Sequence, residues 1–413
     1  ASGVSSHYRL IFNPVPLTYK SAKGSKIIDI DNNKYIDYAL GAGPIVLGHA
    51  PKKIINAVKK SLNKGQLFYG QHNNELNLAK KITKIIPCAE RVRFASSGSE
   101  AVHAAIRLSR GYNKKNIIVK FDGHYHGWFD NQYININPLD NKKGKSNSYG
   151  AKIESLGQHL PSAEDIISIP WNDIEIFKKI IKKYKKNISA IIMEPIMCNT
   201  CVILPKIGYL EEIRKICSKE KIILIFDEVI TGFRISLGGA QEYLNVIPDL
   251  SIFAKGIASG FSLSCLAGRK KIMDNFDLNK VVHGGTYNSN VVNTVAALKT
   301  IEEMDNNNFF KKLNNYRKKL TKEFINIATK KKLIINIQGV GSIFHISFTN
   351  KKILTNYQDY IETDKEKLKI FIQKLQNNKI RITGRGTWFI SSAHSKRDME
   401  KTIISFKKCI NKL

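Results

Sequence analysis

The chain has 413 residues, of which 43% are hydrophobic and 24% charged, a composition typical of a globular protein rather than a disordered one. Its net charge of +32 comes from 66 lysines and arginines against 34 acids. Because no zinc-finger spacing or aromatic RNA-binding signature accompanies this charge, we expect a solvated basic surface and no nucleic-acid partner. No apolar run reaches the roughly 18 residues of a membrane span, and the start, ASGVSSHYRL, does not resemble a signal peptide.

The first elements are short. Residues 26–40, KIIDIDNNKYIDYAL, predict two strands on either side of Asp31-Asn32-Asn33, a turn signal. A helix is predicted over residues 49–62, with Pro51 near its start, and another over residues 73–85.

From about residue 91, short apolar strands alternate with amphipathic helices. This alternation predicts an α/β fold with a mainly parallel sheet that helices cover on both faces. Sheets of this kind bind ligands at the carboxyl ends of their strands. The predicted strands are 91–95, 116–121, 189–193, 222–226, 250–254 and 264–267, and the predicted helices are 99–112, 175–184, 208–219 and about 290–304.

Two later regions differ from this pattern. Residues 130–162 are polar and aperiodic, which is typical of a lid or a mobile segment. After residue 305 the sequence predicts a smaller α+β domain. It would consist of a helix over 309–330, strands over 333–338 and 342–349, a helix over 364–376, a further strand and a last helix.

The cysteines bear on compartment and metal binding. Six cysteines are few for this length, which favours a reducing compartment, so we expect a cytoplasmic protein. Cys198 and Cys201 form a single CxxC pair without a second pair or suitably spaced histidines, so no metal site is expected.

The stretch SSGSEA, residues 96–101, follows a predicted strand and opens a predicted helix. Backbone amides of Ser97, Gly98 and Ser99 at a helix N-terminus favour a bound anion such as phosphate. Serine and glycine also suit an ordinary helix cap, so the motif alone leaves both interpretations open.

Three more side chains lie at predicted strand ends. Tyr125, between two glycines, is placed to stack on a flat ligand. Asp227 ends the apolar run IILIF, where an acid either pairs with a cationic ring nitrogen or caps a helix. Lys255 lies in SIFAKGIASG, where an amine either has a lowered pKa and forms a Schiff base, or extends to solvent. Together, an anion site, a stacking ring, an acid and an amine are what pyridoxal 5'-phosphate (PLP) requires.

With these motifs in order, the chain resembles the class III aminotransferases of PLP fold type I, and among them the glutamate-1-semialdehyde aminomutase branch. The motifs that carry the resemblance are SSHYR (5–9), NKYIDY (33–38), ASSGSEA (95–101), YHG (125–127), FDEVITGFR (226–234), LGGAQEY (237–243), AGR (267–269) and GGTYN (284–288), with Glu194-Pro195 and Lys255-Gly256.

The resemblance implies an organisation into three parts. Residues 1–65 would be an N-terminal segment that joins the small domain, residues 66–304 the large PLP-binding domain, and residues 305–413 the C-terminal small domain. It also implies a homodimer with shared active sites, in which Thr286 reaches the phosphate across the interface.

Roles carry over by position as well. Lys255, Asp227 and Tyr125 are implied to be catalytic, with Lys255 as the Schiff-base lysine. The other implied cofactor contacts are Ser97, Gly98 and Ser99 at the phosphate, Tyr125 and Val229 on the two ring faces, His126 in the same pocket, Asn199 at the ring hydroxyl, and Glu194 in support.

The substrate residues depart in part from the aminomutase pattern. Arg9 occupies the position where that branch uses an arginine for a substrate carboxylate. In the segment RITGRGTWFIS, residues 381–391, Gly386 replaces the acid that contacts the substrate's amino groups, and Arg385 lies beside it. Losing an acid and gaining a cation suits a second carboxylate, although an arginine can also simply pair with a surface acid.

Three functions are therefore carried forward. The main hypothesis is an aminotransferase that moves an amino group between a carboxylate-bearing amine, such as a β- or ω-amino acid, and a keto acid or aldehyde acceptor, in a ping-pong reaction. The alternative is glutamate-1-semialdehyde 2,1-aminomutase, an enzyme of tetrapyrrole synthesis. The third is a non-catalytic basic binding module.

Overall fold

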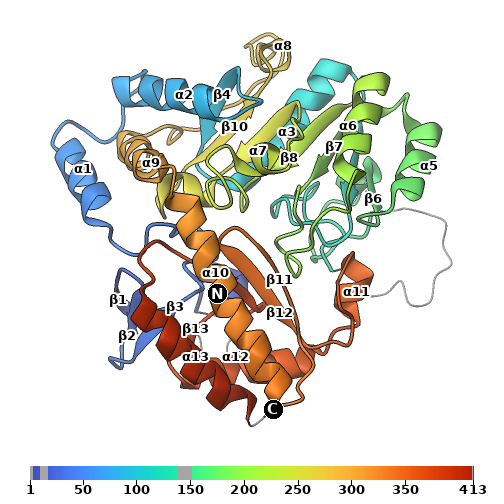
Figure 1. Cartoon of the computed structure of the whole chain (residues 1–413). Coiled ribbons are helices and arrows are strands. Elements are labelled where there is room, and N and C mark those ends of the chain that lie inside the picture. The colour runs from blue at the N-terminus through green and yellow to red at the C-terminus, as the bar shows by residue number, and fades with distance from the viewer. Residues whose placement is uncertain (1–2, 10–16, 138–150, 412) are drawn as a thin grey trace.

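The computed structural model describes residues 3–9, 17–137, 151–411 and 413 (Figure 1). Its largest sheet has seven strands in the order β4-β10-β9-β8-β7-β5-β6. Their bounds are β4 (Arg91–Ala95), β5 (Ile117–Phe121), β6 (Ile166–Ile169), β7 (Ile188–Met193), β8 (Ile223–Asp227), β9 (Leu250–Phe253) and β10 (Ser264–Gly268). Strand β10 is antiparallel to both of its neighbours, and the other pairs are parallel. The predicted α/β fold with a mainly parallel sheet is confirmed.

Helices cover this sheet, as their apolar spacing predicts. The elements that belong to this part are α3 (Gly98–Asn113), α4 (Pro161–Glu164), α5 (Ile174–Tyr184), α6 (Tyr209–Glu220), α7 (Gly239–Tyr243), α8 (Lys270–Met273) and the 3-10 helix η2 (Lys255–Ala258). Helix α5 is an example of this amphipathic spacing. Its residues Phe177, Ile180 and Ile181 are buried on one face. The lysine pairs Lys178-Lys179 and Lys182-Lys183 are exposed on the other face. These pairs are part of the solvated basic surface that the sequence predicts.

The remaining strands form two small sheets. One has the order β1-β2-β3-β13 and the other β11-β12-β14. Their bounds are β1 (Tyr19–Lys23), β2 (Lys26–Asp29), β3 (Lys34–Asp37), β11 (Asn336–Val340), β12 (Ile343–Ser347), β13 (Ile380–Arg381) and β14 (Thr387–Phe389). Strand β3 pairs in parallel with β13, so the N-terminal and C-terminal parts of the chain share a sheet.

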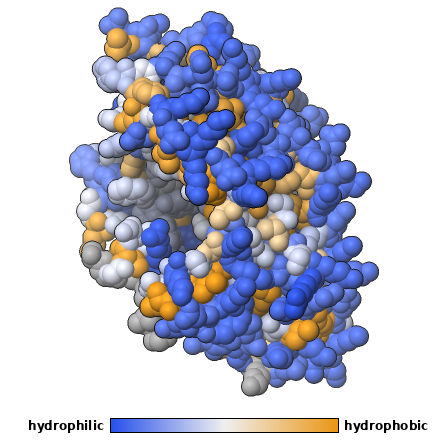
Figure 2. All heavy atoms as spheres, turned by 90° about the vertical axis from the view of Figure 1, so that its left-hand side faces the viewer, coloured by the Kyte–Doolittle hydropathy of each residue, from blue (hydrophilic) through white to orange (hydrophobic). Residues whose placement is uncertain are grey.

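The other helices are η1 (His7–Arg9), α1 (Lys52–Leu62), α2 (Asn73–Ile85), α9 (Val291–Met304), α10 (Phe309–Lys330), α11 (Tyr357–Ile361), α12 (Lys365–Asn377) and α13 (Lys396–Ile410). Helix α2 packs against β4 and α9, and α1 against α9, whereas α10 and α12 pack against α13 and contact strands of the small sheets. The long helix α10 follows α9 and leads from the large sheet to the lower part of the molecule (Figure 1). Figure 2 shows a mostly hydrophilic face with a hollow at mid-height.

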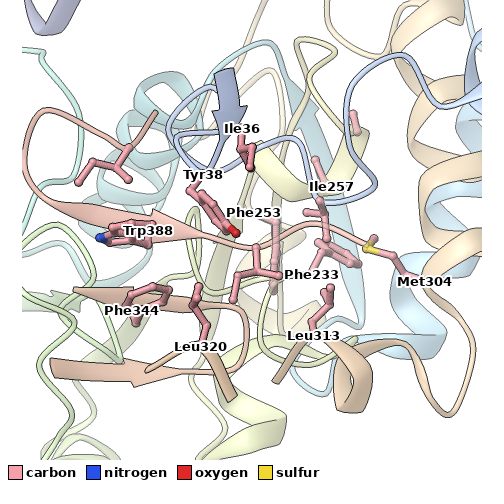
Figure 3. Packing of buried hydrophobic residues seen from close by; sticks show 14 of the residues in the cluster. Ile36, Tyr38, Phe233, Phe253, Ile257, Met304, Leu313, Leu320, Phe344 and Trp388 are labelled. Carbon is pink, nitrogen blue, oxygen red and sulfur yellow. The ribbon is translucent and has the colours of Figure 1, made fainter. Parts of the chain in front are cut away.

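One hydrophobic cluster runs through all three predicted parts of the chain. It joins Tyr38 from the N-terminal segment, Phe233 and Phe253 from the large sheet region, and Phe344 and Trp388 from the C-terminal part (Figure 3). The rings of Phe344 and Trp388 stack with centroids 5.2 Å apart. The boundaries at residues 65 and 304 stay a prediction.

The polar segment 130–162 is described only in part, since residues 138–150 lie outside the described residues. Its two described flanks meet at an isolated bridge between Ile134 and Ile153. Whether this segment closes over a site stays a prediction. No helix in the described parts of the chain is long and apolar enough to cross a membrane.

Candidate active site

The predicted site residues meet at the carboxyl edge of the large sheet. Asp227 is the last residue of β8, Glu194 follows β7, and Lys255 begins η2 just after β9. They line one cavity of about 310 Å³. The predicted cofactor residues on its wall are Ser97, Gly98, Ser99, Tyr125, His126, Glu194, Asn199, Asp227, Val229 and Lys255.

The N-terminus of α3 forms part of the cavity wall. The Glu100 carboxylate accepts hydrogen bonds from the Ser96 amide at 3.0 Å and from the Ser97 amide at 2.7 Å. Together with the Ser97 hydroxyl, which caps the helix, this forms a capping box. The amides of Gly98 and Ser99, the first two helical residues, point along the helix axis without an intrahelical acceptor. These two amides, rather than that of Ser97, are left to receive an anion.

A buried acid–imidazole pair, His126 and Asp227, also lines the cavity. The Nδ1 atom of His126 is 2.7 Å from Oδ2 of Asp227, and both side chains are buried. Burial lowers the pKa of His126 well below its ordinary 6.5, so the ring is neutral, and it donates Nδ1–H to Asp227 when that acid is ionised. Burial also raises the pKa of Asp227 to about 7, opposed by the Val229 amide and the charge of Lys255. A cation against Asp227 would favour its ionised form.

Glu194 ties three parts of the site together. Its Oε1 accepts from the Tyr125 amide and from Nδ2 of Asn199, each at 2.9 Å. Its Oε2 accepts from the amides of Cys198 and Asn199 at 2.9 and 3.1 Å. Burial, followed by the charge of Asp227, raises the pKa of Glu194 to about 7. The carboxylate therefore holds the backbone of Tyr125 and the side chain of Asn199, and its role toward a cofactor stays a prediction.

Lys255 lines the same cavity. Its backbone has a φ of +41°, a conformation that most residues avoid. Burial lowers its pKa to about 8, although the charges of Glu194 and Asp227 oppose this shift. A substantial fraction of neutral amine near pH 7 to 8 is what a nucleophile or base requires.

The two predicted ring-face residues come from different loops, which follow β5 and β8. Tyr125 is half-buried and packs edge-on against Tyr8, with ring centroids 5.8 Å apart. Val229 reaches the α3 N-terminus, since a Cβ at Gly98 would lie 3.1 Å from its Cγ2. Gly98 thus keeps the end of α3 open to the cavity.

A second cavity, of about 780 Å³, adjoins the first, and Tyr125, Asn199 and Lys255 line both. Arg9 and Arg385 line this second cavity and not the first. The guanidinium of Arg385 lies over the ring of Tyr8, 4.7 Å from its centroid. The sequence-predicted substrate residues therefore stand next to the predicted cofactor residues.

Thr286 is exposed and lines neither cavity. A role at the phosphate is therefore one that it would play in a partner's site, and this stays a prediction. In the described residues, no three side chains of His, Cys, Asp or Glu are grouped as metal ligands, and all six cysteines are free and buried.

Some functional neighbours were missed from the sequence. Tyr8 against Tyr125, Gln132 donating to the Ser99 carbonyl at 3.0 Å, and His345 behind Arg385 are all contacts between distant segments. No local sequence pattern predicts these contacts, because they depend on how distant loops pack in the folded chain.

The sequence profile of the family described as Aminotransferase class-III matches residues 11–406. The chain belongs to this family. It is 38% identical over 415 residues to a glutamate-1-semialdehyde 2,1-aminomutase of Methanosphaera stadtmanae, covering 100% of this chain and 95% of that one. It is 39% identical over 414 residues to the protein of the same name from Methanococcus vannielii, with the same coverage.

Solved structures agree with the fold. An omega-transaminase from Sphaerobacter thermophilus superimposes with a TM-score of 0.94 at 26% identity, covering 98% of this chain and 93% of that one. A glutamate-1-semialdehyde-aminomutase from Pseudomonas aeruginosa gives a TM-score of 0.89 at 18% identity, covering 100% and 91%, and shows the shared fold alone.

As a class III aminotransferase, the chain is a PLP-dependent enzyme, so a non-catalytic binding module is ruled out. The cavity suits this cofactor. Two free amides at the α3 N-terminus suit its phosphate, the Asp227 carboxylate suits its ring nitrogen, and the amine of Lys255 suits its aldehyde. Tyr125 and Val229 also line the cavity and suit the two faces of the ring.

Proposed function

We propose that this enzyme is a glutamate-1-semialdehyde 2,1-aminomutase. The observation that supports the proposal most strongly is full-length similarity: 38 and 39% identity to two aminomutases over 100% of this chain. Identity at this level over the whole chain favours the aminomutase over the aminotransferase that the sequence motifs suggest first. Moving the amino group of glutamate 1-semialdehyde from carbon 2 to carbon 1 gives 5-amino-4-oxopentanoate, and the reaction needs no second substrate.

Residues of this chain would hold the cofactor and transfer the proton. PLP, when bound, supplies an electron sink for the substrate carbon that loses a proton. Lys255 takes this proton and returns one during the transfer, since its lowered pKa lets the amine act as both base and acid. Asp227, hydrogen-bonded to Nδ1 of His126, would keep the ring nitrogen protonated. Tyr125 and Asn199, both hydrogen-bonded to Glu194, would hold the ring.

A second candidate is supported by the turn at Gly386. An aminotransferase acting on carboxylate-bearing amines and keto acids would suit a turn that has a glycine in place of the acid and an arginine beside it. Gly386 has a φ of +87°, and a Cβ on it would lie 3.0 Å from Nε2 of His345 and from Cδ1 of Leu368. The turn is therefore strained for any side chain, including the acid that the aminomutase branch places there, and Arg385 stands beside it.

One experiment separates the two candidates. The purified holoenzyme is incubated with glutamate 1-semialdehyde alone, and 5-amino-4-oxopentanoate is measured after condensation to a coloured pyrrole. The aminomutase forms this product without an added amine or keto acid, and Lys255→Ala loses at least about 10³-fold in rate. The exposed Lys369 on α12 offers a matched control, Lys369→Ala, which should keep the wild-type rate.

The opposite outcome is equally informative. If no product forms, but glutamate, a β-amino acid or an ω-amino acid bleaches the visible band of the cofactor and a keto acid restores it, the enzyme is an aminotransferase.

A further inference from the structure

A buried lysine lies behind the turn that carries Tyr125. Lys120, on β5, is 2% exposed and lines neither cavity. Among the described residues, no acid forms an ion pair with its ammonium group. Burial lowers its pKa to about 8, although the charges of Asp122, Glu154 and Glu194 oppose this shift, so the group is mostly a cation at neutral pH. Burying an ammonium group without a paired acid is costly, which raises the question of what this cation does.

The ammonium group of Lys120 donates hydrogen bonds to two backbone carbonyls. One is the carbonyl of His124, at 3.1 Å, and the other is the carbonyl of Ile134. Ile134 lies in a described flank of the polar segment 130–162. Lys120 therefore joins the turn over residues 123–127 to this flank.

The peptide bond between His124 and Tyr125 is held from two sides. Its carbonyl accepts from Lys120, and its N–H, the amide of Tyr125, donates to Oε1 of Glu194 at 2.9 Å. The C=O and N–H of a trans peptide point in opposite directions within one plane, so the two side chains together fix the orientation of that plane. A hydrogen bond from an ammonium group is stronger than one between neutral groups.

The large sheet supplies both of these side chains. Lys120 is the fourth residue of β5, and Glu194 directly follows β7. The two strands are neighbours in the sheet and run in parallel. Both contacts therefore come from the rigid part of the fold rather than from a loop.

The residue before this peptide is also fixed. The amide of Gly123 donates to the Asn135 carbonyl at 2.9 Å, and its carbonyl accepts from the Thr200 hydroxyl at 3.1 Å. The backbone that leads to Tyr125 thus has a defined path, and Lys120 acts on the last peptide bond before that ring.

We propose that Lys120 is a positioning residue for the cofactor, which fixes the peptide bond before Tyr125 and thereby the position of the Tyr125 ring on one face of PLP. This inference rests on the predicted role of Tyr125 at the ring face, and not on the choice between the two reactions proposed above. The competing explanation is that Lys120 only satisfies two buried carbonyls. In that case no effect of its replacement would depend on the ring of Tyr125.

A double-mutant cycle on cofactor binding separates these explanations. The probe is 4'-deoxypyridoxine 5'-phosphate, which has a methyl group in place of the aldehyde of PLP and so cannot form a bond with Lys255. It is titrated by calorimetry into the full-length protein from which PLP has been removed. Tyr125→Ala should raise the Kd of the probe about 10-fold through the lost ring contact.

The second half of the cycle replaces Lys120. Lys120→Met keeps the length of the side chain without its donors, and should raise the Kd about 5-fold. In the Tyr125→Ala background the same replacement should raise the Kd less than about 2-fold, because the ring through which Lys120 acts is already absent.

Two further variants serve as controls. Lys186→Met removes an exposed lysine that lines neither cavity, and should leave the Kd unchanged. Lys120→Gln keeps N–H donors but not the charge, so its Kd should fall between those of wild type and Lys120→Met. It replaces Lys120→Met in the cycle if the latter does not fold, which the melting temperature of each variant shows.

The proposal is overturned if Lys120→Met binds the probe like wild type, or if it raises the Kd by the same factor with and without the Tyr125 ring. It is also overturned if Tyr125→Ala binds the probe like wild type, because the predicted ring contact is then absent. The cycle measures no turnover. A failure to convert glutamate 1-semialdehyde would therefore overturn the proposed function and leave the result for Lys120 unchanged.

Discussion

At the scale of the residue, Asp227 combines burial with a charge that the reaction needs. Asp227→Asn keeps the shape of the side chain and removes its charge. Because the cofactor ring would lose its electrostatic partner, kcat should fall at least about 10²-fold. Steady-state rates of holoenzyme check this. Asp31→Asn, at an exposed turn, is the matched control and should keep the wild-type kcat.

The same residue makes a prediction about pH. Because the pKa of Asp227 is raised from 3.8 to about 7, the folded chain binds more protons than the unfolded chain between these values. The free energy of unfolding therefore falls as pH rises through this range. In cofactor-free protein, wild type should lose more stability than Asp227→Asn between about pH 5 and about pH 8, measured by urea unfolding. Equal losses would contradict the raised pKa.

Residues also show how far the sequence predicts the site. Asp227 and Lys255 were predictable because each ends an apolar strand, and strand ends in a parallel sheet share one edge. The hydrogen-bond partner of Asp227 could not be predicted in this way. His126 lies 101 positions away in the sequence, and its hydrogen bond depends on how the 123–127 turn packs against β8. The strain that a side chain would meet at Gly386 could not be predicted either, because it comes from the positive φ of the turn and from His345 and Leu368, which lie close to it.

At the scale of the element, helix α3 links folding to cofactor binding. Glu100→Ala removes the acceptor of the Ser96 and Ser97 amides and should destabilise the protein by about 1 kcal/mol, as for a lost cap. It should also weaken the affinity for PLP, since the freed N-terminus no longer presents the Gly98 and Ser99 amides in a fixed direction. Equilibrium dialysis against PLP measures this.

Helix α13 has the same kind of capping box, formed by Ser395 and Asp398, and Ser395 lines neither cavity. Ser395→Ala should therefore cost a similar stability, about 1 kcal/mol, and leave the PLP affinity unchanged. Equal PLP affinities for Glu100→Ala and Ser395→Ala would show that the α3 cap serves stability alone.

Elements differ in how well local patterns predicted them. The long amphipathic helices and buried strands appear within a few residues of their predicted bounds, because their periodicity reflects burial on one face. Strands β1 and β6 were missed, since one is mostly exposed and the other has only four residues. The direction of β10 follows from its connection: residues 254–263 are too few for the dozen or so that a parallel crossover needs.

At the scale of the whole molecule, the position of Thr286 predicts a site built from two chains. It is exposed and lines neither cavity of its own chain, so its predicted contact with the phosphate requires a homodimer. Thr286→Asp would place a negative charge against this phosphate and should abolish PLP binding by like-charge repulsion. Lys255→Ala should abolish turnover independently of Thr286.

Combining the two variants tests which chain each residue serves. Lys255→Ala and Thr286→Asp chains, co-expressed with different affinity tags, are purified as heterodimers. If Thr286 acts in the partner's site, both defects fall in one site and the other site is intact, so the heterodimer should show about half of the wild-type rate. If Thr286 acts within its own chain, each site carries one defect and the heterodimer stays inactive. An inactive heterodimer that is correctly assembled by sedimentation would therefore rule out the shared site, while recovered activity would require that the dimer is the catalytic unit.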